Sequence, residues 1–185
     1  MATLILKEEV ALGGVAEMMK EMGLVELEAP SMEGMCRRLW MTSNEKSAVH
    51  YVDDSITRVR YFSVRGSKVT SLVKALRRKL PLWTRDELLK HALFLLISGS
   101  EQDIARVAME VAAEMDAYDA ASAGVLTTLL NVDERTTRLA GARAFRARPW
   151  AIFRDRAAEL AGDSDPEIAS LGAEMLARII ELHGE

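Results

Sequence analysis

The residues best suited to chemistry are few. The stretch "HYVDD" places His50, Asp53 and Asp54 at the end of an expected strand, and His and Asp side chains are common metal ligands. Asp-Asp before Ser is also ordinary turn chemistry, because a turn carboxylate accepts hydrogen bonds from nearby backbone N–H groups. We favour the turn and predict no metal site.

A catalytic nucleophile is equally hard to assemble. Cys36 is the only cysteine, and the neighbouring Arg37 and Arg38 would favour its thiolate. No histidine partner is identifiable, since His91 falls on an apolar helix and His183 near the end of the sequence. There is no glycine-rich phosphate loop, no H-E-x-x-H and no G-x-S-x-G. We predict no catalytic residues, no cofactor and a protein that is not an enzyme.

The composition indicates a folded protein. Of the 185 residues, 49% are hydrophobic and 28% charged, a balance typical of globular domains. No apolar run approaches the roughly 20 residues that a membrane span needs, and "HALFLLI" is far too short. The opening "MATLILKEEV" lacks the pattern of a signal peptide. We therefore expect a cytoplasmic protein without a membrane partner.

The last 80 or so residues contain a repeat of 32 residues. Three copies align, and the expected second helix of each copy carries an apolar row and a small-residue row: Val107, Leu139, Leu171 and Ala108, Ala140, Gly172. Small residues at these positions would let neighbouring helices approach closely. A period of this size is typical of stacked helix pairs.

Capping residues mark where the second helices begin. Ser100, Asp133 and Asp165 each precede one, and Pro166 suits the first helical position. The first helices of the pairs are expected at 86–97, 118–130 and 150–162. The segment 67–80 matches the second helices at the same offset and is predicted to be an unpaired copy.

The best copy, "SDPEIASLGAEMLARI", resembles a short HEAT-like (armadillo-type) repeat of the kind found in phycobilisome lyase subunits. The resemblance covers residues 68–185 and rests on Asp165-Pro166 with Ile168, Leu171 and Gly172 behind it. The middle copy departs from the pattern at Thr136 and Arg143. The resemblance implies an α–α superhelix. Such arrays mostly bind proteins, while a few bind nucleic acid or assist chromophore attachment.

The N-terminal third has a different pattern. A helix is expected at 8–22, and strands with β-branched and aromatic content are expected at the segments 24–28, 35–41, 47–52 and 57–64. We predict a small α+β domain over residues 1–66, with an antiparallel meander of three or four strands. It would cap the helical stack, since solenoid ends expose an apolar face. The predicted fold is thus mainly α, with about three 32-residue helix pairs within residues 67–185.

Charge is distributed in alternating blocks. The net charge is −4, yet residues 55–85 contain nine basic and no acidic side chains. At the 32-residue offset, three rows on the second helices mix both signs and indicate ion pairing between helices: Asp103, Arg135, Glu167; Arg78, Glu110, Ala142, Glu174; and Glu114, Arg146, Arg178. Lys74, Arg106 and Arg138 instead share both register and sign.

This basic row leads to the functional hypothesis. We predict an adaptor that holds an acidic or amphipathic segment of a partner protein on the concave helical face, using Lys74, Arg78, Arg106 and Arg138. A nucleic-acid-binding module using the same row is the alternative, although an acidic protein with 5% aromatic residues is poorly suited to a polyanion. A lyase-like or chaperone-like accessory subunit is suggested by the resemblance alone.

Overall fold

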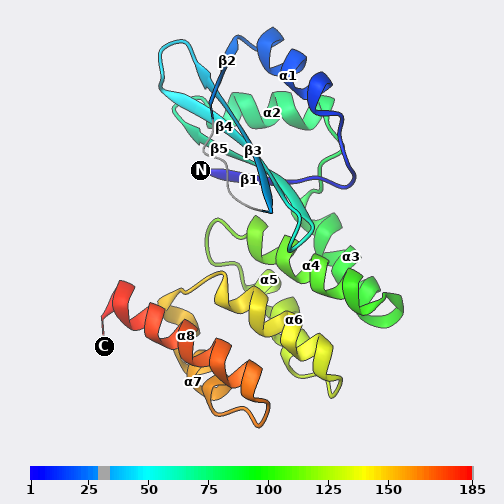
Figure 1. Cartoon of the computed structure of the whole chain (residues 1–185), viewed down its shortest axis with the longest axis vertical. Helices are drawn as coiled ribbons and strands as arrows, with labels where there is room; N and C mark the ends of the chain where they lie inside the picture. Colours follow the sequence, from blue (N-terminus) through cyan, green and yellow to red (C-terminus); the bar gives the residue numbers. More distant parts are fainter. Residues whose placement is uncertain (29–33, 185) are drawn as a thin grey trace. The chain divides into compact units, whose positions relative to one another are not determined.

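The computed structural model describes residues 1–28 and 34–184, which form eight α-helices and a five-stranded antiparallel sheet (Figure 1). The chain divides into two compact units, an N-terminal unit, Met1–Arg85, and a C-terminal unit, Asp86–Glu185. No helix in the described part of the chain is long and apolar enough to cross a membrane.

The sheet of the N-terminal unit contains the predicted meander and one further strand. Its strands are β1 (Ala2–Ile5), β2 (Leu24–Leu27), β3 (Met35–Thr42), β4 (Ser47–Asp54) and β5 (Val59–Gly66), in the spatial order β1-β5-β4-β3-β2. The strand that sequence reasoning missed, β1, pairs with β5, and Leu4 lies opposite Phe62. Its outer edge is met by a later segment: Leu6 bridges to Leu82, and the Trp83 N–H donates to the Ile5 carbonyl at 2.9 Å.

Two helices, α1 (Leu12–Glu21) and α2 (Val69–Lys79), pack on one face of this sheet. Leu72 and Leu76 of α2 are buried in the same core as Trp40, Tyr51 and Phe62. The prediction that 67–80 belongs to the helical repeat is therefore wrong, and the boundary lies at residue 85 instead of 66. The apolar stripe of α2 is buried against the sheet.

The C-terminal unit consists of helices. They are α3 (Arg85–Ser98), α4 (Glu101–Glu114), α5 (Ala120–Leu130), α6 (Arg135–Arg146), α7 (Arg154–Ala161) and α8 (Pro166–His183), with a 3₁₀ turn at Ala151–Phe153. All three predicted pairs are present as helices. The second helices α4, α6 and α8 lie side by side, with α5 against α6 and α7 against α8 (Figure 1). Whether the stack is a superhelix of the HEAT type stays a prediction.

The caps explain where the second helices begin. The Ser100 hydroxyl accepts from the Asp103 N–H at 3.2 Å, and Asp165 caps α8 ahead of Pro166, both as predicted. The cap of α6 is Glu134, whereas Asp133 was predicted. Side-chain and backbone hydrogen bonds from Thr136, and then from Thr137, lower the pKa of Glu134 to about 2.

Candidate functional site

The structure divides the predicted basic row between the two units. Lys74 and Arg78 are exposed on α2 of the N-terminal unit, while Arg106 and Arg138 are half-buried on α4 and α6 of the C-terminal unit. The repeat register that joined these residues rested on the wrong assignment of α2. The row is therefore not a single feature of one helical stack.

The two arginines in the C-terminal unit already have partners. The Arg106 guanidinium pairs with Asp103 at 3.2 Å, within one turn of α4. The Arg138 Nη1 donates to the carbonyl oxygen of Asp133 at 2.8 Å, near the N-terminus of α6. These contacts hold both side chains near the ends of their own helices, which leaves them less suited to binding an anionic ligand.

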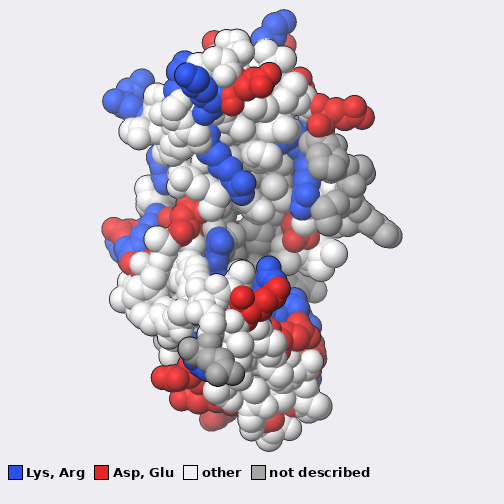
Figure 2. Space-filling view, turned by 90° about the vertical axis from the view of Figure 1, so that its left-hand side faces the viewer, with Lys and Arg blue, Asp and Glu red and all other residues white. Residues whose placement is uncertain are grey.

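The prediction of ion pairing between second helices is confirmed for α6 and α8. Among the described residues, four ion pairs join them: Arg135 with Asp165 and with Glu167, Arg143 with Glu167, and Arg146 with Glu174. Figure 2 shows basic and acidic side chains interspersed on one side of the molecule. The pairs that involve Glu167 and Glu174 are solvent-exposed, so each adds little stability, whereas the Asp165 side chain that faces Arg135 is largely buried.

Glu110 departs from the predicted exposed row. Its side chain lies in the interior of the C-terminal unit, with the residue only 4% exposed. Burial raises the pKa of the Glu110 carboxyl to about 7, against the opposing effect of the Arg106 charge. Ala142, which follows it in the same row, is also buried. The carboxyl of Glu110 therefore changes charge near neutral pH.

The residues of "HYVDD" form part of the sheet and its turn. Asp53 pairs with Arg60 at 2.9 Å, and the Asp54 carboxylate accepts from the backbone N–H groups of Ile56 and Thr57. This is the turn chemistry that we favoured. Burial, and then the charges of Arg65 and Arg37, lowers the pKa of His50.

The remaining chemically capable residues lie on separate elements, Cys36 in the N-terminal unit and His91 and His183 in the C-terminal unit. The Cys36 thiol is exposed on β3. His91 is half-buried on α3, where burial lowers its pKa, and an imidazole nitrogen of His183 lies 3.2 Å from the carbonyl oxygen of Pro149. Within the described residues, no group of three or more His, Cys, Asp or Glu side chains is arranged to hold a metal ion.

The surface that sequence reasoning missed is the apolar outer face of α3. Leu93, Phe94 and Ile97 are 48%, 62% and 89% exposed, whereas the opposite face of the helix buries Leu88, Ala92 and Leu95. Exposed apolar side chains that gather in one place are typical of interaction surfaces. The signal in the sequence is "HALFLLI", which falls within the predicted first helix 86–97 and is apolar on both sides of that helix.

Comparisons of the chain with protein-family models, with curated proteins and with solved structures give no match. The resemblance to HEAT-like repeats accordingly remains a prediction from the residues.

Proposed function

We propose that this protein is a non-catalytic adaptor that holds a partner protein against the helices of its C-terminal unit. The observation that carries the proposal is the exposed apolar face of α3, formed by Leu93, Phe94 and Ile97. Covering these side chains removes apolar area from water at about 25 cal/mol per Å², which is the main driving force of most protein association.

The expected partner segment is amphipathic. A helix with an apolar stripe can place large side chains between Leu93, Phe94 and Ile97, in the common mode of helix recognition. This retains the adaptor hypothesis and moves the binding surface from the basic row to α3. The nucleic-acid alternative receives less support, because Arg106 and Arg138 are held by contacts within their own unit.

The test compares proteins captured from a lysate of the source cell by the native chain and by a Phe94→Asp, Ile97→Asp variant. A matched control, Ile152→Asp, Leu182→Asp, changes two other apolar residues of the C-terminal unit that are 61% and 50% exposed. We expect one discrete protein to be captured by the native chain and the control and lost from the α3 variant. Circular dichroism checks that all three chains are folded.

Other outcomes would contradict the proposal in different ways. Equal capture by all three chains would show that α3 is not the binding surface. Capture that nuclease abolishes, and that is lost from a Lys74→Glu, Arg106→Glu, Arg138→Glu variant, would favour the nucleic-acid alternative. Dimerisation of the native chain in light scattering, lost only in the α3 variant, would mean that the face binds a second copy instead of a partner.

A further inference from the structure

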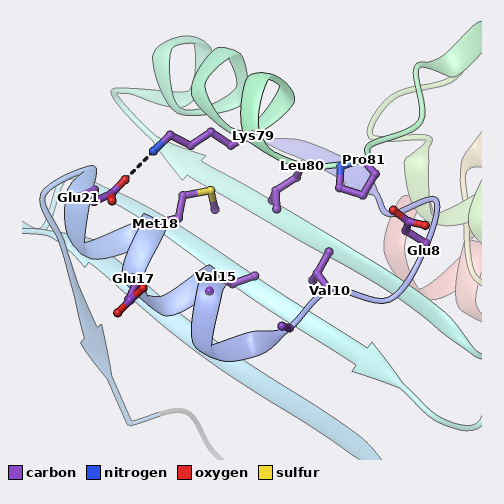
Figure 3. A pocket seen from close by; sticks show the side chains of 11 residues that line it. Glu8, Val10, Val15, Glu17, Met18, Glu21, Lys79, Leu80 and Pro81 are labelled. Carbon is purple, nitrogen blue, oxygen red and sulfur yellow. Dashed lines mark hydrogen bonds and ion pairs between the residues drawn. The ribbon is translucent and has the colours of Figure 1, made fainter.

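The N-terminal unit contains a groove that its own core does not fill. It lies between α1 and the C-terminal end of α2, beside the segment that leads into α1, and has a volume of about 550 Å³ (Figure 3). Its apolar lining includes Val15 and Met18 of α1, with Leu80 and Pro81 after α2. The volume falls within the range of roughly 300–1,000 Å³ that is typical of small binding pockets.

The rim of the groove is acidic. Glu8, Glu17 and Glu21 line it and are exposed, and Lys79 is the one basic residue among its described lining residues. Lys79 is already engaged, because its ammonium group donates to the Glu21 carboxylate at 2.7 Å across the two helices. Glu8 and Glu17 therefore leave uncompensated negative charge beside an apolar floor.

The two glycines of α1 leave the helix surface at the edge of the groove without side chains. Gly13 and Gly14 lie in the first turn of the helix, and Gly14 lines the groove. A Cβ placed on either glycine would meet nothing within 4 Å, so packing within the chain does not require them. A helical glycine costs about 1 kcal/mol relative to alanine. Their open surface would let another backbone approach α1 closely.

We propose that this groove binds a polypeptide segment of a partner protein in which Lys or Arg flanks a large apolar side chain. The apolar side chain enters between Val15, Met18 and Leu80, the basic group pairs with Glu17 or Glu8, and the segment passes over Gly14. This site is separate from α3. It would bind a basic segment, whereas the predicted basic row would bind an acidic one. With both sites, the adaptor would hold two different partners at once.

The experiment selects peptides from a random dodecapeptide phage library against the intact chain. We expect enrichment of sequences that combine Lys or Arg with Leu, Ile or Phe. A synthetic copy of an enriched peptide should bind the native chain and bind a Gly14→Leu variant roughly ten-fold more weakly or worse, because the new side chain occupies the groove. Glu17→Lys should weaken binding as well, most strongly at low salt.

A matched control keeps the test specific. Gly124 in α5 is also exposed, and a Cβ there meets nothing within 4 Å, so Gly124→Leu repeats the substitution outside the groove. It should leave peptide binding unchanged. Leucine is a better helix former than glycine, so Gly14→Leu should remain folded, and thermal unfolding by circular dichroism verifies this.

Three results would overturn the proposal: no enrichment, enrichment of acidic peptides, or peptides that bind Gly14→Leu and Glu17→Lys as tightly as the native chain. Peptides that bind both groove variants as tightly as the native chain, but no longer bind the Phe94→Asp, Ile97→Asp variant, would bind α3 instead. They would support the adaptor function while excluding the groove, so the two proposals can fail separately.

Discussion

Gly172 of α8 lies directly against Leu160 of α7: a Cβ on this glycine would stand 2.7 Å from the Leu160 Cβ and closer still to the backbone of Ala161. The glycine therefore sets how closely the two helices approach. It belongs to the small-residue row with Ala108 and Ala140, both of which are buried. The close approach that the repeat predicted is confirmed at this position.

A Gly172→Ala variant should be less stable, although alanine is the better helix former. The added methyl group overlaps backbone atoms that cannot move without separating α7 from α8, and we expect a loss of about 1–3 kcal/mol in the free energy of unfolding. Urea denaturation measures it. Gly124→Ala is the control, because its Cβ has open space and should stabilise the chain by up to about 1 kcal/mol. Equal effects of the two substitutions would contradict the overlap.

The Asp165 side chain has two roles, because it caps α8 and also forms an ion pair with α6. Its carboxylate accepts from the Glu167 N–H at 2.9 Å and the Ile168 N–H at 3.2 Å, and it also pairs with Arg135 of α6. Asp165→Ala should lower the thermal midpoint by roughly a few degrees, because it leaves these amides without their cap. Asp165→Asn keeps a capping oxygen and should lose less. Equal losses for alanine and asparagine would mean that the ion pair with Arg135, which both variants lack, matters more than the cap.

The buried carboxyl of Glu110 should make stability depend on pH. Its pKa is about 7 when folded and near the ordinary 4.5 when unfolded, so the folded chain binds more protons between these values. The stabilisation that this group contributes is therefore complete below pH 4.5. It decreases as the pH rises from there through 7, and it does not change further at higher pH. The predicted loss is on the order of 3 kcal/mol.

Glu110→Gln isolates this effect. The variant should match the native chain at pH 4 and be more stable at pH 8, as measured by urea denaturation across the range. Subtracting the two profiles removes the contributions of His50 and His91, whose lowered pKa values act in the opposite direction. A constant difference between the chains over this range would refute the titration of Glu110.

The sequence was sufficient to locate most helices, because caps and apolar periodicity are local signals. The sequence was not sufficient to decide whether a given helix packs against other helices or against the sheet. Leu72 and Leu76 of α2 suit a helical repeat or a sheet equally well, and the buried contacts that decide between them come from Trp40, Tyr51 and Phe62. The short strand β1 was missed because four residues give too little alternation to recognise.

The candidate site was harder to predict for the same reason. A 32-residue offset correctly paired Arg135 with Glu167, since α6 and α8 are true neighbours. Extending that offset to Lys74 failed, because α2 is not a member of the stack. The apolar face of α3 is not visible from composition, because a helix that is apolar on both sides looks the same whether its second side is covered or exposed.

The pairing of β1 has a consequence for the order of folding. This strand precedes the other described strands along the chain, yet one partner is β5 and its other edge is met by residues 81–83. The N-terminal unit must therefore close a loop of nearly its whole length, whereas the helix pairs join near neighbours, and long closures slow folding. In stopped-flow refolding of chains that retain only Trp40 or only Trp150, the Trp150 signal should recover first.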